Sequence, residues 1–128
     1  MSIWTPDMAR IIVPQPARWL SMNDRNGHWS QRSGPTGAWR TQTAWLARDL
    51  RPIPTPVAID AVVHKSRGGR WDAHNLMPTV KACIDGVVDA GLIPDDDCKH
   101  LIRVSIEAGP KSASPNLTLT ITTTEETK

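Results

Sequence analysis

The stretch WDAHNLMPTVKACIDGVVDAGLIPDDD, from Trp71 to Asp97, has the pattern of one helix between two acidic segments. Pro78 suits the first turn of a helix, where its missing N–H breaks no hydrogen bond. Four apolar residues then recur at helical spacing and form one stripe, namely Val80, Ile84, Val87 and Val88. Gly91 is a natural terminator. The stretch therefore predicts a helix from Pro78 to Ala90 with one buried face.

This stretch is acidic, whereas the chain before it is basic. It holds six aspartates against Lys81 and His74, while residues 1–70 hold ten lysines and arginines against four aspartates. An acidic segment framed by basic arms suits a polyanion that is held by its phosphates while one phosphate reacts through a metal ion. An ordinary solvated surface is the alternative interpretation of the same charges.

The rest of the chain predicts strands, a second helix and loops. Strands are expected where apolar and β-branched residues run or alternate, at 10–13, 57–64, 101–107 and 116–122. A helix is expected from about 38 to 50, where Arg51-Pro52 ends it. Loops are expected at Ser21–Gly37 and at 65–71, the latter basic and flexible, and a frayed tail at 123–128.

The order β, α, β, α, β, β predicts one small domain over residues 1–128, of α/β (mixed α+β) class, with a mixed β-sheet and two main helices. With 128 residues, 39% apolar and 22% charged, the chain is long enough for one modest core. No apolar run approaches the roughly 18 residues of a membrane span, and the N-terminus lacks the apolar block of a signal peptide. We therefore expect a soluble, cytoplasmic protein with no membrane partner.

The cysteines and tryptophans are expected to be structural. Cys83 and Cys98 have neither a CxxC pair nor a histidine at zinc-finger spacing, which argues against a structural zinc site. Both are expected to be reduced thiols, Cys83 in the core and Cys98 on a loop. The six tryptophans are expected mainly in core and helix packing, with surface contacts as the alternative.

Candidate metal ligands flank the predicted helix. Three consecutive carboxylates, Asp95 to Asp97, repel one another unless a cation or a basic partner compensates. Mg²⁺ would be an economical cation, because it takes oxygen ligands and needs only one or two protein carboxylates. Asp72 and His74 would project to one side if the backbone there is extended, and Asn75 adds a further polar group. A solvated loop, a surface histidine and a helix cap are the alternatives for these residues.

Three motifs occur together at fixed spacing: D-x-H-N-L from Asp72, K-x-x-x-D from Lys81 to Asp85, and A-G-L-I-x-D-D ending at Asp96. Together they resemble the RusA family of Holliday junction resolvases, small phage and prophage endonucleases with a D-x-D-N motif, a helical K-x-x-x-D and a D-D pair. The N-terminal strand and Ser21–Asn23 also resemble the opening of that family. The resemblance therefore covers roughly the whole chain.

The resemblance implies a RusA-like fold and a metal-dependent endonuclease that resolves four-way DNA junctions by paired phosphodiester hydrolysis. Its metal would be Mg²⁺, with Mn²⁺ as the second candidate, and it would need no small-molecule cofactor. It further implies a two-fold homodimer, because two symmetric cuts need two symmetric sites. The protein would act in the cytoplasm of a bacterial host, encoded there or by a phage.

Roles for single residues also follow from the resemblance. The catalytic residues would be Asp72, Lys81 and Asp96. The metal ligands would be drawn from Asp72, His74, Asp95 and Asp96, supported by Asn75 and Asp85. Basic residues would hold the DNA backbone, namely Arg25, Arg32, Lys65, Arg67 and Arg70. Trp29 or Trp71 would stack on an unpaired base at the branch point.

Two departures from the family pattern bear on activity. His74 stands where the family has its second aspartate, and a neutral nitrogen there weakens Mg²⁺ binding and favours Mn²⁺. Met77 to Thr79 look inserted before Lys81. These departures leave open a junction-binding module with weak or lost cleavage. A third alternative is a structural domain that binds Ca²⁺ through Asp95 to Asp97.

The length of the predicted helix raises a question of geometry. A helix from Pro78 to Ala90 is roughly 20 Å long. Asp72 and Asp96 lie at its two ends in the sequence, so they meet within one subunit only if the segment 92–96 folds back along the helix. Otherwise a second subunit must supply one of them.

Overall fold

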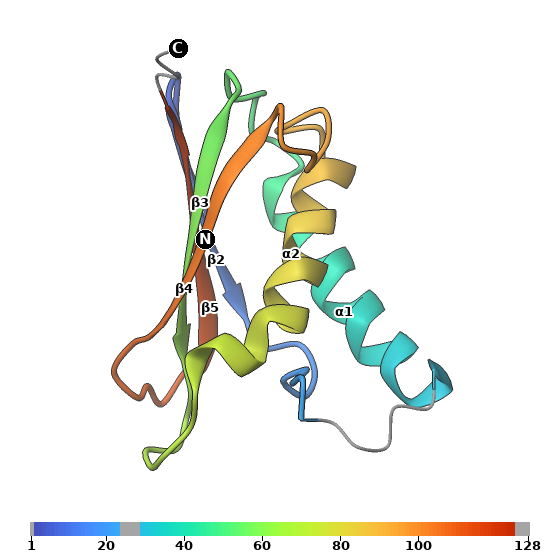
Figure 1. The fold of residues 1–128 in the computed structure, drawn as a ribbon, viewed down its shortest axis with the longest axis vertical. Helices are drawn as coiled ribbons and strands as arrows, with labels where there is room; N and C mark the ends of the chain where they lie inside the picture. The colour runs from blue at the N-terminus through green and yellow to red at the C-terminus, as the bar shows by residue number, and fades with distance from the viewer. Residues whose placement is uncertain (1, 24–28, 125–128) are drawn as a thin grey trace.

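The protein has two layers, a five-stranded β-sheet and a pair of helices that cover one of its faces (Figure 1). The computed structural model describes residues 2–23 and 29–124, without the side chains of residues 29–32. The helices are α1 (Trp29–Ala47) and α2 (Met77–Asp89), with a short 3₁₀ turn, η1 (Ala73–Leu76), before α2. The predicted α+β class with two main helices is confirmed. None of the described helices is long and apolar enough to span a membrane.

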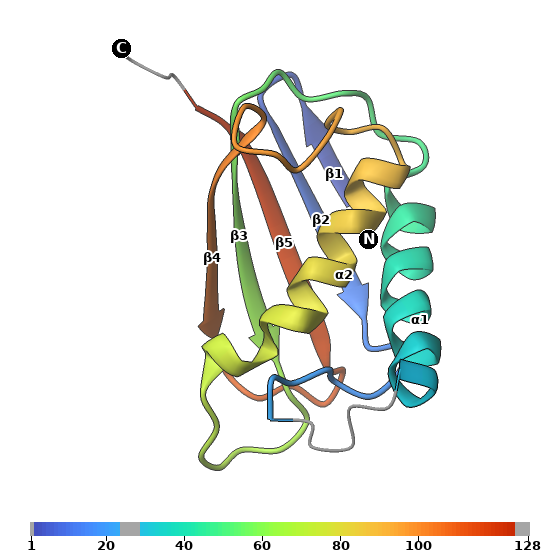
Figure 2. The ribbon, with the colours of Figure 1, turned by 45° about the vertical axis from the view of Figure 1, so that its right-hand side comes forward.

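The sheet is mixed, as predicted. Its strands are β1 (Ser2–Thr5), β2 (Met8–Pro14), β3 (Val57–His64), β4 (Leu101–Ala108) and β5 (Asn116–Thr123). They lie in the order β1-β2-β5-β3-β4, so β1 and β4 form the two edges (Figure 2). Only the β3–β4 pair is parallel among the described strands. A parallel pair needs a long crossover, and residues 65–100 provide it with η1 and α2.

The core lies between the sheet and the helices. Alternate side chains of the three central strands point at the helices and are fully buried, among them Ile11, Ile59 and Leu119. Trp39 of α1 is also fully buried; its ring centroid lies 4.8 Å from that of Trp19, and its indole N–H donates to the Arg18 carbonyl at 3.0 Å. Large apolar side chains from the N-terminal segment, α1 and the sheet thus form one core.

The two helices pack closely at Gly86. A Cβ placed on Gly86 would lie 2.9 Å from Thr43 Cβ and would also collide with the Arg40 carbonyl oxygen. Glycine is therefore required where α2 crosses α1. Nearby on α2, burial raises the pKa of the Cys83 thiol to about 12, which leaves it protonated and unreactive. Cys83 is buried and Cys98 is exposed, both as predicted, and both are free thiols.

The second helix of the fold follows its prediction closely. Pro78 lies in its first turn, and Val80, Ile84 and Val87 are buried. Gly91 has a positive φ of 83°, the left-handed conformation that ends helices. The apolar periodicity and the two end signals agree with one another, which explains the success of the prediction.

Two other expectations about elements were wrong, and one strand was missed. The polar segment 29–37 belongs to α1 and is not a loop; Gly34, Pro35 and Gly37 conceal the helix because they are poor helix formers. The strand β1 was not predicted, since four residues are too few to show an alternation. The tail does not fray at Thr123, which is the last residue of β5, and the Thr124 N–H donates to the Pro56 carbonyl at 2.9 Å. Residues 125–128 lie outside the described part of the chain.

Candidate functional site

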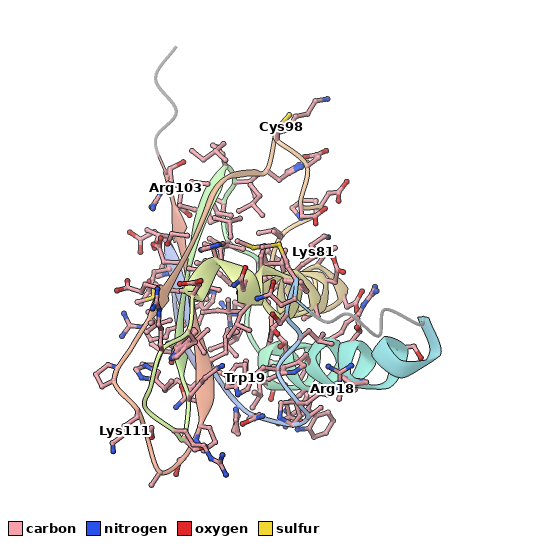
Figure 3. The ribbon with its side chains drawn as sticks, turned by 60° about the horizontal axis from the view of Figure 1, so that its bottom comes forward. Arg18, Trp19, Lys81, Cys98, Arg103 and Lys111 are labelled. Carbon is pink, nitrogen blue, oxygen red and sulfur yellow. The ribbon has the colours of Figure 1, made fainter. Side chains whose placement is uncertain are left out.

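Lys81 lies between two carboxylates that come from different parts of the chain. Its Nζ donates to Asp85 Oδ1 at 2.7 Å and to Asp96 Oδ2 at 2.6 Å. Asp85 is one turn further along α2, whereas Asp96 belongs to the loop between α2 and β4. In Figure 3, Lys81 lies on the side of α2 below the loop that carries Cys98. Folding thus joins two of the three sequence motifs.

The loop that carries Asp96 turns back along α2. Leu92 and Ile93 anchor it, since both are buried in the core. The Leu92 N–H donates to the Val87 carbonyl at 3.2 Å, and the Leu92 carbonyl accepts from the Ile53 N–H at 2.9 Å. Asp96 therefore reaches Lys81, fifteen residues earlier in the sequence. A site within one subunit requires the segment 92–96 to fold back along α2. This fold-back is present, and it brings Asp96 to Lys81.

The three consecutive aspartates each have a separate partner. Asp95 Oδ1 accepts from the Asp96 N–H at 2.7 Å, and Asp96 binds Lys81. Asp97 Oδ1 accepts from the Lys99 N–H at 3.2 Å and lies 2.6 Å from His100 Nδ1. Protein groups, among them Lys81 and His100, therefore offset part of the repulsion that we expected a cation or a basic partner to offset.

These contacts change the proton affinities of both members of the pair. Hydrogen bonding from Lys81 holds the pKa of Asp96 below its ordinary value, although partial burial opposes this shift. Burial by itself would lower the pKa of Lys81, but the hydrogen bonds to Asp85 and Asp96 together raise it. At neutral pH Lys81 is therefore an ammonium and Asp96 a carboxylate.

Lys81→Met is expected to raise the pKa of Asp96 toward the ordinary aspartate value of about 3.9. Because the folded-state pKa is the lowered one, the pair stabilises the fold above about pH 4, and this contribution is lost as the pH falls through the folded-state pKa. A carboxyl-carbon NMR titration measures the shift. Asp89 is the internal control, since Arg40 lowers its pKa and Lys81 does not contact it. An unchanged Asp96 pKa in the variant would contradict the ion pair.

Asp72 lies in a second group of predicted residues, around a pocket of about 350 Å³. The pocket is lined by residues from four segments, namely Trp19, Ser21, Asn23, Lys65, Arg70, Trp71, Asp72, Asn75 and Leu76. Asp72 has an extended backbone and leads into η1, where the Asn75 N–H donates to the Asp72 carbonyl at 3.1 Å. Three side chains predicted to bind metal or DNA, Lys65, Arg70 and Asp72, are thus gathered there, together with the supporting Asn75 and with Trp71.

The N-terminal wall of the pocket is held by a buried threonine. Thr79 Oγ1 accepts from the Leu20 N–H at 2.7 Å and donates to the Leu20 carbonyl at 2.9 Å. The Met22 N–H also donates to the Asn75 carbonyl at 2.8 Å. Trp19 and Ser21 are brought to the pocket by these contacts. We did not predict Trp19 as a lining residue, because only the tertiary contact with α2 reveals it.

His74 does not occupy the position that we expected. The backbone from Ala73 to Leu76 is a 3₁₀ turn, so Asp72 and His74 do not alternate along an extended strand. The turn forms because it continues directly into α2. His74 is exposed, and the pocket is lined by its neighbours Asp72 and Asn75. The extended backbone that would have projected His74 and Asp72 to the same side, as two metal ligands, is therefore absent from Ala73–Leu76.

The predicted DNA-binding residues are only partly described. The segment 65–71 is irregular, as expected for a loop, and Lys65 Nζ lies 4.6 Å from the centroid of the Trp71 ring. Arg70 lines the pocket and Arg67 is exposed nearby in the sequence. Arg25 lies outside the described residues, as do the side chains of Arg32 and Trp29.

The possible metal ligands do not converge within one chain. Among residues 2–23 and 29–124, no group of three or more His, Cys, Asp or Glu side chains could hold a metal ion. Asp72 lines the pocket, while Asp96 binds Lys81. A closed protein site of the kind zinc prefers is therefore not formed by these residues. Mg²⁺ bound by one or two carboxylates, waters and substrate phosphates fits them better.

No protein-family model matches this chain, and no curated protein sequence matches it.

Proposed function

We propose that the protein is a metal-dependent endonuclease that cuts branched DNA, such as four-way Holliday junctions, in the manner of the RusA family. The observation that supports this proposal best is the Lys81 cluster. Folding brings the lysine of K-x-x-x-D to the second aspartate of the D-D pair, with Nζ to Oδ2 at 2.6 Å. A plain surface helix has no need of this long-range contact, whereas a phosphoryl-transfer site needs a lysine and carboxylates together.

Lys81 is suited to act on a phosphate. Its side chain is 56% exposed, and its ammonium group has three N–H donors, of which Asp85 and Asp96 take two. The third can donate to a phosphate oxygen and stabilise the charge that develops there. The raised pKa keeps the ammonium group protonated while it does so.

The carboxylates would hold a divalent ion between protein and DNA. Asp96 and Asp95 on the loop, and Asp72 at the pocket, would be the ligands, either from one subunit or from the two subunits of a homodimer. When bound, Mg²⁺ or Mn²⁺ supplies polarisation of the phosphate and a bound water of lowered pKa. The low pKa of Asp96 keeps this carboxylate ionised at neutral pH.

The pocket would bind DNA beside the reacting phosphate. Lys65 and Arg70 bring positive charge to it and Trp71 brings an aromatic surface. Such a combination holds a DNA backbone through its phosphates and stacks on an unpaired base, which a branch point supplies and a linear duplex does not. Selectivity for branched DNA would therefore arise from the pocket, and the chemistry from the Lys81 cluster.

A junction-binding module with weak or lost cleavage is the second candidate. Two observations favour it: His74 replaces an acidic ligand, and no three-ligand group forms among the residues that the structure describes. Both candidates bind branched DNA with a strong salt dependence, so only cleavage separates them.

The decisive experiment compares Asp96→Asn with the wild-type protein on a labelled four-way junction and a matched linear duplex, with Mg²⁺ or Mn²⁺. We expect symmetric nicks in the junction alone, and a loss of rate of at least about 100-fold in the variant while binding persists. Asp49→Asn is the matched control, since Asp49 is 86% exposed and far from the cluster in the sequence. Tight binding without cleavage in either metal would favour the binding module. Stabilisation by Ca²⁺ without DNA binding would favour the structural domain.

A further inference from the structure

The strand β4 forms an open edge of the sheet. It pairs with β3 on one side and, within the described part of the chain, with no strand on the other (Figure 2). The opposite edge, β1, is tied to α1 and to the connector after it: Ser2 Oγ donates to the Leu46 carbonyl at 2.6 Å, and Trp4 Nε1 donates to the Arg51 carbonyl at 2.8 Å. An eight-residue edge strand such as β4 is a template for pairing with another chain, and its irregularity against β3 is confined to Ile102, near its start.

Apolar side chains along β4 remain partly exposed. None of its eight side chains is fully buried, although Val104 and Ile106 pair with the buried Ile59 and Ala61 and so share the helix-covered face. Ile102 is 44% exposed. The strands β3 and β5 bury the side chains on that face, except for Thr123 at the end of β5. A partner strand along β4 would bury more of these apolar side chains.

The sequence of β4 is complementary to itself. If two copies of LIRVSIEA pair antiparallel about Ser105, Arg103 lies opposite Glu107 of the partner subunit, on the face away from the helices. On the helix-covered face Val104 lies opposite Ile106 of the partner subunit. Directly opposite charges and apolar pairs both stabilise antiparallel strands.

Other registers lose this complementarity. Side chains keep their face only if the register shifts by two residues. A shift in one direction places Arg103 opposite Ser105 and Glu107 opposite Leu101; a shift in the other places Arg103 opposite Gly109 and Glu107 opposite Ser105. Only the register centred on Ser105 pairs the two charges.

We propose that two copies of this chain associate through β4, antiparallel about a two-fold axis at Ser105, to form one continuous sheet. Arg103 can serve both subunits. Its Nη1 donates to Asp60 at 3.0 Å within the chain, and a guanidinium group has further N–H donors for Glu107 of the partner subunit. Ser105 Oγ donates to the same Asp60 carboxylate at 2.5 Å, so the central residue is already oriented.

The test is a charge exchange, read out as the dissociation constant of the dimer by analytical ultracentrifugation of the full chain without DNA. Arg103→Glu and Glu107→Arg each place like charges opposite one another twice per dimer, and each is expected to weaken association about tenfold or more. The double variant restores both opposite-charge pairs and is expected to recover wild-type association. A wild-type protein that is monomeric at 100 µM, single variants that dimerise as well as wild type, or a double variant that fails to recover would each overturn the proposal.

A second measurement does not depend on the charged residues. Ser105→Cys in a Cys98→Ser background is expected to form an intermolecular disulfide on mild oxidation, because Cβ atoms directly opposite one another in antiparallel strands lie about 4.5–5.5 Å apart. Thr118→Cys, on the strand β5 that is paired on both sides, is the matched control and is expected to remain uncrosslinked. Equal crosslinking of both variants would contradict the register. Neither measurement involves cleavage, so they test the interface independently of the nuclease proposal.

Discussion

Replacing Trp39 with alanine is expected to lower the free energy of unfolding by about 3–5 kcal/mol, the range for large buried aromatic side chains. Trp39 is fully buried beneath α1, packs on the Trp19 ring and donates its indole N–H to the Arg18 carbonyl. The variant loses this packing and leaves a cavity, and the Arg18 carbonyl loses its donor. Urea unfolding, followed by circular dichroism, measures the change through the transition midpoint.

Trp45 on the same helix provides the matched control. Its side chain is 59% exposed, and its principal contact is with the Arg48 guanidinium group, 3.7 Å above the ring. Trp45→Ala is expected to change the free energy of unfolding by no more than about 1 kcal/mol. Similar losses of unfolding free energy in Trp39→Ala and Trp45→Ala would show that α1 does not pack on the sheet through Trp39.

Lys81→Met is expected to slow junction cleavage by about 10²–10³-fold at saturating DNA, if the proposed nuclease activity holds. Methionine keeps the length and much of the packing of the aliphatic stem but removes the donor that the phosphate would use. Binding of the junction should weaken by no more than about tenfold, because several other phosphate contacts remain. Single-turnover cleavage and a binding titration measure the two quantities separately.

Lys65→Met is expected to give the opposite pattern. Lys65 lies at the pocket over the Trp71 ring and not in the Lys81 cluster. Loss of the Lys65 ammonium group should weaken junction binding and reduce the slope of the log binding constant against log salt concentration by about one. The cleavage rate at saturating DNA should be unchanged. A Lys81→Met protein that cleaves at the wild-type rate would remove Lys81 from the proposed mechanism.

The parts of the fold that could be predicted are those whose local signals agree. The helix after Pro78 and the strand at 57–64 both showed continuous patterns with clear ends, and both were found. The start of α1 was missed because its first turns contain glycine and proline, whose intrinsic preferences oppose the helix. The buried face formed by Trp39, Thr43 and Ala47 overrides that preference, and burial of this kind is a tertiary property.

The candidate site was predictable in part for a similar reason. The pairing of Lys81 with Asp85 follows from helical spacing alone. The contact with Asp96 depends on how the loop after Gly91 turns, and the pocket depends on Thr79 binding the Leu20 backbone. Neither interaction leaves a local pattern in the sequence. Among the described residues, the lack of a three-ligand group that includes Asp72 and Asp96 likewise became visible only in three dimensions.

The parallel pairing of β3 with β4 has a consequence for how the site comes into being. The two strands are neighbours in the sheet, yet the whole crossover 65–100 separates them along the chain. The chain must close this long loop before the pairing stabilises it, so non-local contacts of this kind form slowly. Lys81, Asp96 and the pocket residues Lys65 to Leu76 all belong to that crossover. The β1–β2 hairpin can form earlier from local contacts, whereas the candidate site exists only once this crossover has closed.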